Sequence, residues 1–430
     1  MKRVTQLLIS VLLLMCASCS DFSTGNRKAD IDSFSSLTFD LTRSQNEVAN
    51  CQLNFGLSVF KSACSLGCEK LLVSPFSMAV DLSMLAAGTT GEAYDELNQA
   101  LGFQDFSQEQ ICDFYNVASS RLTESSDSAF SIANAIWINS DSKVGFDKTI
   151  KDDFKQIVND CYQAEVAALV FDNKAISSIN EWAKNKTNGK IEKVIDAFLP
   201  GDVLVLNNAI NFDGSWHHRY NVGNGTFTSE TGKKTKKQFI CGDDPFVHMW
   251  NLKKESPKEP AVLGIPFEGK YEMYFFLPPE NQSINNFIKS IDARKWVGWI
   301  SKADYDKQPA DRMVSFQIPF FDSGESESTP WIDVLESMGV SKIFEEPDFS
   351  PMTSSDLPLK VTNISQNNKI SVNEKGCNAA SVSTIVVGFE TSNFNEPGQE
   401  CYSFIADRPF VYAIVEKTTQ TILFMGTVTE

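Results

Sequence analysis

The chain has 430 residues, 42% of them hydrophobic, so it can bury the core of one large domain or of two or three small ones. Its formal net charge of −17 argues against nucleic acid as a partner and against adsorption to anionic lipid. The three histidines, His217, His218 and His248, leave little room for a histidine-based metal site, and we expect neither a metal nor a cofactor.

The N-terminus has the pattern of an export signal rather than of a folded segment. Residues 2–3 are basic, and the apolar stretch that follows, 7–15, is too short to span a bilayer permanently. Ser18 before Cys19 is similar to the lipobox of bacterial lipoproteins. These features predict a lipoprotein signal peptide over 1–18 and lipidation of Cys19.

The lipid would be the only attachment of this chain to a membrane. Cys16 is an alternative lipidation site, but it follows a bulky methionine. Ser20 and Asp21 partly resemble the signal that sends some lipoproteins to the outer face. Residues 19–45 are polar and predict a lipidated flexible tether. We expect secretion across the inner membrane and anchoring at the outer membrane or cell surface, with the periplasmic face as the alternative.

Helices precede strands in the remaining sequence, and no linker divides it, which predicts one α+β domain over 46–430. Apolar spacing predicts helices at 47–65, 75–87 with Ser74 as cap, 91–101, 146–161, and 179–188 with Asn180 as cap. Predicted strands lie at 71–73, 131–138, 164–171, 204–212, 261–265, 271–277, 313–319 and 358–372, followed by a C-terminal hairpin of 410–416 and 421–428.

One uncharged run, 376–389, has the pattern of a β-strand. It contains no proline, its first half is small and its second half is β-branched. Alternation puts Cys377, Ala379, Ser381, Ser383, Ile385 and Val387 on one face, which can be buried. The run ends at Glu390 in a polar segment typical of an exposed loop. On pattern alone this is an ordinary strand and turn.

Several short blocks of sequence, in order from residue 47 to the C-terminus, match one family. They are Leu72–Ser77, Asn134–Trp137, Ile179–Trp182, Asn208–Ile210, Gly214–Trp216, Glu374–Gly376 with Ala379 and Ala380, Phe404–Ile414 and Leu423–Gly426. With these blocks the chain resembles a serpin. The resemblance implies three β-sheets with eight or nine helices and an exposed reactive loop.

The resemblance also implies a function without catalytic groups of the chain's own. A serine protease, or as a second class a cysteine protease, would cleave the loop and form an acyl-enzyme. The freed hinge would insert into the main sheet and trap that protease, so the chain would be a monomeric inhibitor and not an enzyme. The implied hinge residues are Glu374, Gly376, Cys377, Ala379, Ala380, Ser381 and Ser383. The implied sheet-opening residues are Ser74, Ser77, Asn208, Trp216 and Gln366.

The position of the cleaved bond depends on the end from which it is counted. The usual hinge length, counted from Glu374, predicts cleavage between Glu390 and Thr391, which would suit a Glu-preferring protease. Cleavage after Phe389 or Val387 would suit chymotrypsin-like or elastase-like enzymes. Counting back from Pro409 instead leads to the neighbourhood of Gly398. We favour the first count, because the sheet sets the inserted length while the far side of the loop can lengthen.

Two residues depart from the family pattern. Cys377 replaces a threonine or another small residue and can oxidise. Gln366 replaces a histidine beneath the sheet, and we expect it to bridge Ser74, Ser77 and Asn208 by hydrogen bonds without a pH response.

Eight cysteines follow Cys19, and none forms a Cys-x-x-Cys pair, so a zinc or redox motif is not indicated. We expect buried or free thiols, although an oxidising compartment permits one or two bridges. A bridge between Cys377 and Cys401 would tether the hinge and make inhibition redox-sensitive; this is a hypothesis.

Three rival functions remain to be compared with the inhibitor. One is a non-inhibitory serpin that acts as a binding protein or as a plain protease substrate, against which the small hinge residues argue. Another is a hydrolase, but His217 and His218 have no Gly-x-Ser-x-Gly motif to serve, and we expect them at the surface. The third is a glycan-binding protein using Trp250, Trp296 or Trp299, for which core packing is the better use.

Overall fold

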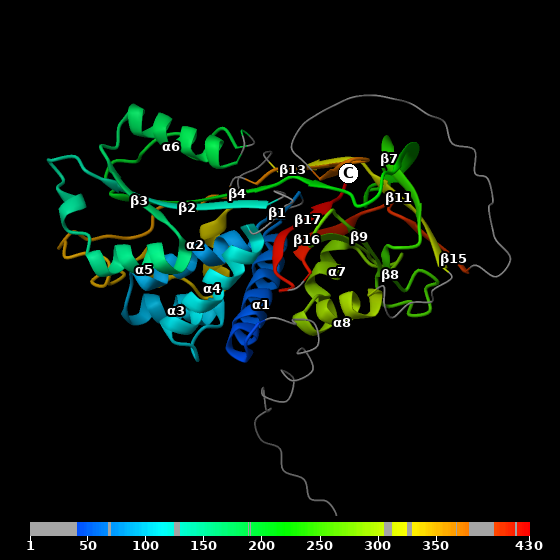
Figure 1. Ribbon diagram of the computed structural model, residues 1–430, viewed down its shortest axis with the longest axis horizontal. Helices are drawn as coiled ribbons and strands as arrows, with labels where there is room; N and C mark the ends of the chain where they lie inside the picture. Colours follow the sequence, from blue (N-terminus) through cyan, green and yellow to red (C-terminus); the bar gives the residue numbers. More distant parts are fainter. Residues whose placement is uncertain are drawn as a thin grey trace, which may run out of the picture. The chain divides into compact units, whose positions relative to one another are not determined.

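The computed structural model describes residues 41–67, 70–123, 130–187, 189, 191–304, 312–324, 329–366, 368–377, 400–417 and 419–430. The helices over these ranges are α1 (Arg43–Ser65), α2 (Pro75–Ala87), α3 (Gly91–Leu101), α4 (Gln108–Thr123), α5 (Asp152–Tyr162), α6 (Asn173–Lys186), α7 (Ile284–Ser290), α8 (Ala293–Ala303) and α9 (Trp331–Ser337). None of the helices in these ranges is long and apolar enough to cross a bilayer. Helices mixed with mainly antiparallel sheets confirm the predicted α+β class (Figure 1).

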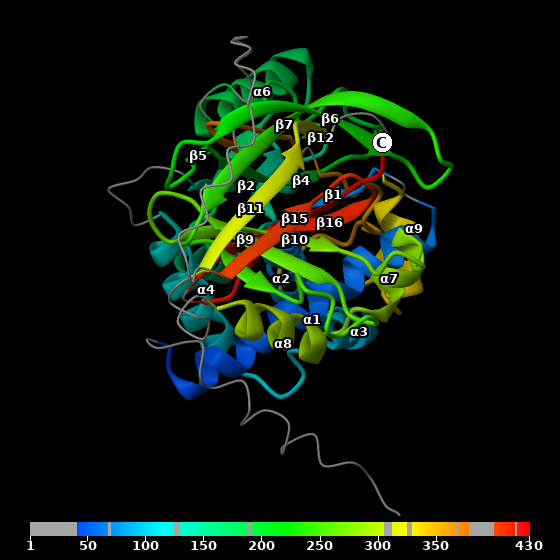
Figure 2. The ribbon, with the colours of Figure 1, turned by 90° about the vertical axis from the view of Figure 1, so that its right-hand side faces the viewer.

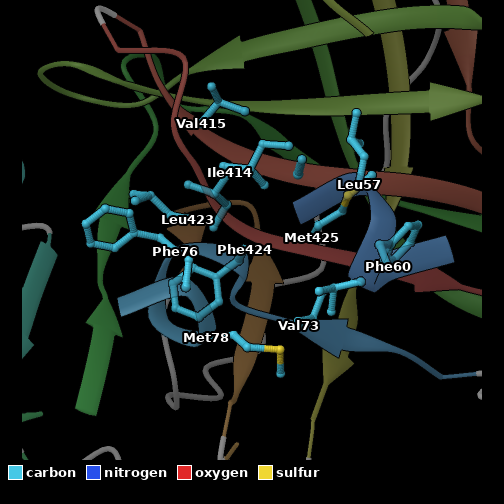
Figure 3. Close-up of a cluster of buried hydrophobic side chains, with 14 of the residues drawn as sticks. Leu57, Phe60, Val73, Phe76, Met78, Ile414, Val415, Leu423, Phe424 and Met425 are labelled. Carbon is cyan, nitrogen blue, oxygen red and sulfur yellow. The ribbon is translucent and has the colours of Figure 1, made fainter. Parts of the chain in front are cut away.

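A six-stranded sheet forms the centre of the core. Its order is β1 (Leu72–Val73), β17 (Ile422–Val428), β16 (Phe410–Glu416), β10 (Tyr271–Leu277), β9 (Ala261–Pro266) and β8 (His248–Trp250). Every residue of β10, β16 and β17 is buried. Figure 3 shows why: Leu57 and Phe60 from α1 and Phe76 and Met78 from α2 meet Phe424 and its neighbours in β17.

A second sheet carries the chain that follows the predicted loop. Its order is β15 (Glu400–Ile405), β11 (Arg312–Pro319), β7 (Lys234–Asp244) and β6 (Asn221–Thr228). β15 pairs in parallel with β11, with Cys401 opposite Met313, and lies at the sheet edge (Figure 2). β6 and β7 form a hairpin, and Lys233 lies in its turn.

The third layer consists of two pieces. One is β3 (Glu165–Leu169), β2 (Phe130–Asn139) and β4 (Leu204–Phe212); the other is β12 (Phe321–Ser323), β13 (Ile370–Asn373), β14 (Gly376–Cys377) and β5 (Gly214–Ser215). The two pieces are continuous in the chain, because β4 leads through Asp213 into β5. Helix α6 covers one face of β2, β3 and β4, and α2, α4 and α5 lie on the other (Figure 1).

The predicted strand over 358–372 is wrong for most of its length. Only Ile370–Asn373 is a strand, and the described residues between 358 and 369 form none. The reason is the missing neighbour: over the described residues β4 pairs with β2 alone, so nothing forms a ladder with the segment before β13.

Three helix starts also differ from the prediction, and the first is that of α1, which begins at Arg43 rather than at residue 47. The cap at Ser74 is confirmed by its hydrogen bond from the Ser77 N–H. The helix predicted at 146–161 is a short 3-10 turn followed by α5. The helix predicted at 179–188 begins earlier, and Asp172 caps it. Asn180 instead accepts hydrogen bonds from the backbone of the following loop, a long-range role that local pattern does not reveal.

The described cysteines include one bridge, Cys112–Cys161, which joins α4 to α5. Cys377 is a buried free thiol, so the hypothesised bridge from Cys377 to Cys401 is not formed in this structure. Trp296 and Trp299 are buried in the core, in agreement with the packing role predicted for them. Within the ranges described, no group of three or more His, Cys, Asp or Glu side chains could hold a metal ion.

Candidate functional site

The start of the uncharged run already lies inside the third layer. β14 is paired on one side with β13, where Cys377 lies opposite Val372, and on the other side with β5, where Gly376 lies opposite Ser215. Both pairings are antiparallel. The first two residues of the run are therefore inserted between two strands, as a strand that enters the sheet from its end.

A glycine is required where this strand enters. Gly376 has a φ of +154°, and a Cβ there would lie 2.0 Å from the carbonyl oxygen of Gly214. The next side chain, Cys377, is fully buried, and burial, followed by the charge of Asp213, raises the pKa of its thiol far above the ordinary value. The residue is thus an inert, well-packed component of the sheet.

Trp216 holds the turn between β13 and β14. Its ring stacks on Phe267 with centroids 4.4 Å apart, and its indole N–H donates to the carbonyl oxygen of Asn373 at 2.8 Å. Its backbone N–H donates to the carbonyl oxygen of Lys375 at 3.0 Å. Trp216 therefore lies beside the start of β14, and its role in sheet opening stays a prediction.

A network of hydrogen-bonded polar side chains connects α2 to the piece of the third layer that consists of β3, β2 and β4. The Ser77 hydroxyl donates to Asn208 Oδ1, and Asn208 Nδ2 donates to Asn134 Oδ1, each at 2.5 Å. Asn134 Nδ2 donates in turn to the carbonyl oxygen of Tyr162 at 2.6 Å. The network links α2 to β4, β2 and the end of α5. Asn134 was not among the predicted site residues, although it opens one of the blocks that carry the resemblance.

Gln366 makes fewer contacts than predicted. The Ser74 N–H donates to Gln366 Oε1 at 3.2 Å, and Gln366 Nε2 donates to the Ser74 carbonyl oxygen at 2.9 Å. Ser77 and Asn208 bond to each other rather than to Gln366. Gln366 Oε1 also accepts a hydrogen bond from Asn368 Nδ2 at 3.0 Å, so the amide is held by Ser74 and Asn368 and not by the second pair.

A cavity of about 450 Å³ separates β4 from the segment before β13. Its walls are residues 203–207 on one side and 358–366 on the other. Its floor is formed by α2 through Met78, Asp81 and Leu85. The cavity continues the line of β14, and its two walls are backbone segments that form no ladder with each other. It therefore has the shape of a missing strand.

The family model described as Serpin (serine protease inhibitor) matches residues 50–430. The chain belongs to the serpin family. It is 29% identical to Iripin-1 of Ixodes ricinus over 388 residues, which are 87% of this serpin and 92% of Iripin-1. The native-state structure of the thermophilic serpin tengpin is 27% identical, covers 91% of this chain and 96% of its own, and gives a TM-score of 0.76. Human thyroxine-binding globulin, complexed with thyroxine, is 20% identical with a TM-score of 0.73 over 90% and 99% of the chains, and it shares the fold.

Several predicted residues of this serpin lie outside the described residues. They are Cys19, Ala379, Ala380, Ser381, Ser383, Phe389, Glu390 and Thr391. The described chain resumes at Glu400, at the start of β15. Of the residues predicted for the hinge, the structure describes Glu374 in the turn before β14 and Gly376 and Cys377 in β14, and their role as a hinge stays a prediction.

The two adjacent histidines of this serpin lie at the surface, where the sequence places them. His217 is exposed, and its ring lies 4.7 Å from that of His218. His218 Nδ1 lies 2.9 Å from Asp244 Oδ2, which also accepts a hydrogen bond from Tyr220. These contacts attach the start of β6 to the end of β7.

Proposed function

We propose that this serpin inhibits a protease by acting as its suicide substrate. The observation that carries the proposal is β14: two residues of the uncharged run already pair with β5 and β13, and a strand-shaped cavity lies beyond them. The family description as a serine protease inhibitor supports it. In this role the serpin supplies a bond to be cut and a place to insert, and it needs no catalytic group of its own.

The proposed sequence of events begins with the protease's own nucleophile. Its Ser or Cys attacks the loop carbonyl, forms an ester or thioester with the hinge side, and releases a new amino terminus on the β15 side. The hinge then extends β14 into the cavity before water reaches the acyl bond. The protease, still attached, is carried along and its active site is distorted.

The driving force is the completion of a backbone ladder. About a dozen new hydrogen-bonded pairs at roughly 1 kcal/mol each give a free energy on the order of 10 kcal/mol. Ala379, Ser381 and Ser383 continue the inward face that Cys377 begins, and all are small and neutral. Small inward residues favour fast insertion, and insertion has to be faster than hydrolysis of the acyl bond.

The partner that we propose is a serine protease, with a cysteine protease as the second class. Cleavage between Glu390 and Thr391 would select a Glu-preferring enzyme, and cleavage after Phe389 a chymotrypsin-like or elastase-like one. We further propose that a bacterial lipoprotein signal over 1–18 directs export and that Cys19 carries the lipid. Of the polar tether predicted over 19–45, the last residues, from Arg43, belong to α1, and the part before them would hold the serpin domain at the outer membrane or cell surface.

The test is an SDS gel after incubation with chymotrypsin, elastase and a glutamyl endopeptidase. We expect a covalent adduct with at least one of them, and mass spectrometry of the released C-terminal peptide gives the cleaved bond. Ser381→Pro should abolish the adduct and leave cleavage intact, because proline cannot donate to the new ladder. Asn395→Pro, beyond the predicted cleaved bond, is the matched control and should form the adduct. Cleavage without any adduct would support the non-inhibitory alternative.

A further inference from the structure

The floor of the strand-shaped cavity contains an acidic side chain. Asp81 projects from α2 and borders the cavity. Its Oδ1 atom is inaccessible to solvent and has no hydrogen-bond partner among the described residues. Burial alone raises the pKa of this carboxyl to about 8. Asp81 as a whole is partly exposed, but a carboxyl oxygen that is buried without a partner makes ionisation costly, so its position under the cavity requires an explanation.

Among the described residues, no charged group offsets the burial of the Asp81 carboxyl. The charged side chains that border the same cavity are Asp202 and Lys360. Asp202 accepts a hydrogen bond from the Leu199 N–H at 2.7 Å, and Lys360 is exposed. The helices packed on the other sides of α2 contribute no charged group to the lining; their buried phenol Tyr115 contacts Ser83 instead. The ionisation of Asp81 is therefore governed by what covers it.

The register of β14 identifies what would cover it. Continued without a bulge, the pairings of Gly376 and Cys377 place Ile385 between Leu206 and Ile364. Ile385 lies on the same face as buried Cys377, because the two are an even number of residues apart. The residues beside this position are cavity walls, so Ile385 would enter the cavity from above.

The rise per residue of α2 places Asp81 at the same level as the position of Ile385 in the extended strand. Ser77 is bonded to Asn208, and Asp81 follows Ser77 by four residues, which is about 6 Å along a helix. Two residues along a strand cover about the same distance, which leads from Asn208 to Leu206. Asp81 thus lies beneath the place that Ile385 would take.

We propose that Asp81 controls the last stage of loop insertion, and that Ile385 is accepted over it only when the carboxyl is protonated. This inference rests on the proposed function. An ionised carboxylate under an aliphatic side chain loses its water and gains no donor, since Ile385 and the next inward residue, Val387, offer none. Insertion above about pH 8 then requires uptake of one proton from solvent by Asp81.

We expect pH to change how much of the acyl-enzyme is trapped and how much is hydrolysed. At lower pH, insertion is complete and the protease is trapped; at higher pH, the final residues insert slowly and more acyl-enzyme is hydrolysed. Asp81 would affect the efficiency of inhibition rather than the choice of target protease, because it lies beneath the inserted strand and not at the cleaved bond.

The experiment measures completed insertion without the target protease. The loop is nicked with thermolysin, the nick is located by mass spectrometry, and the melting temperature of nicked and intact chain is compared at about pH 6.5 and about pH 9.5. In the wild type, the rise in melting temperature on nicking should shrink at the higher pH by at least about 5 °C. Asp81→Asn should show the same rise at both values. Asp95→Asn, an exposed acid on α3, is the matched control and should behave as the wild type.

The outcomes separate the inference from the proposed function. A rise that is equal at both pH values in the wild type, or that depends on pH equally in Asp81→Asn, overturns the role of Asp81 and leaves insertion standing. A chain whose melting temperature never rises on nicking, in any variant at either pH, removes insertion itself and this inference with it. Asp81→Ala, which also lacks the charge, provides the same comparison if the amide variant does not fold.

Discussion

Two sheets of this serpin show opposite degrees of completion. In the six-stranded sheet, β16 is hydrogen-bonded to β10 on one side and to β17 on the other, and all three strands are buried. In the third layer, β4 pairs on one side only among the described residues, and a cavity lies on its other side. One sheet is complete, and the other would, under the proposed function, accept a further strand from the loop.

The difference indicates which of the two sheets would gain free energy when the loop is cleaved. The finished sheet gains nothing from cleavage of the loop, because its ladders are closed and its side chains packed. Under the proposed function, the unfinished layer would gain a strand from it.

The largest expected effect comes from nicking the loop between residues 386 and 396. Insertion would complete the third layer, and a gain on the order of 10 kcal/mol should raise the melting temperature by roughly 15 °C. Differential scanning calorimetry of intact and nicked chain measures it. Ser381→Pro, nicked in the same way, should show almost no rise, and an unchanged melting temperature in the wild type would contradict the contrast.

Truncation in the finished sheet should have the next largest effect. Phe424 in β17 is buried, and Phe424→Ala should lower the free energy of unfolding by about 3–5 kcal/mol. Leu206→Ala, in the wall of the cavity, should cost about 1 kcal/mol or less in the intact chain, because Leu206 is only half-buried there. Chemical denaturation measures both; equal losses would mean that the cavity wall is as well packed as the finished sheet.

The finished sheet should also respond to acid. Burial raises the pKa of Glu272, but the hydrogen bond and charge of His248 and the charge of Lys417 outweigh burial and bring it to about 2. The pKa is lowered in the fold, so this contribution is present above about pH 4.5 and is lost as the pH falls towards 2.

Glu272→Gln should therefore lose about 3 kcal/mol at neutral pH and show a flatter acid limb in urea unfolding. The exposed carboxyl of Glu268 supplies the control, and Glu268→Gln should keep the acid limb of the wild type. An acid limb that survives in Glu272→Gln would place the acid sensitivity elsewhere.

The smallest effect on stability is expected at the entry of β14. Gly376→Ala would put a Cβ against the Gly214 carbonyl oxygen, so β14 should leave the sheet at a cost of about 1–3 kcal/mol. The thiol of Cys377 should then react with a maleimide, which peptide mapping detects. Gly298→Ala, which meets no atom within 4 Å, should leave Cys377 protected. If Cys377 stays protected in Gly376→Ala, the start of β14 has room for a Cβ and does not require a glycine.

Features with a local cause could be predicted from the sequence. The cap at Ser74 depends on a hydrogen bond three residues away, and the hairpin of β16 and β17 depends on neighbouring apolar strands, so both are visible in the pattern. The alternation over 377–387 predicts that Cys377 is buried, which the structure confirms, whereas the other residues of that face lie outside the described residues.

Features that depend on residues far away in the sequence could not be predicted. Residues 358–369 have the composition of a strand, but whether they form one depends on a partner that is absent from their side. Asn180 is polar within a helix, and only the folded loop at 194–195 shows what it binds. Asp81 interrupts an apolar helix, and its meaning depends on the cavity above it.

If the loop inserts as proposed, the parallel pairing of β15 with β11 has a second consequence for the uncleaved molecule. While β15 stays in this sheet, its connection to the loop would oppose full insertion of an uncut chain into the cavity. Lys253 contributes to holding this strand, bonding to Glu400 at 2.9 Å and lying 4.5 Å from the ring centre of Tyr402. Release of β15 from β11 would then limit how long an uncleaved molecule keeps its loop outside the sheet.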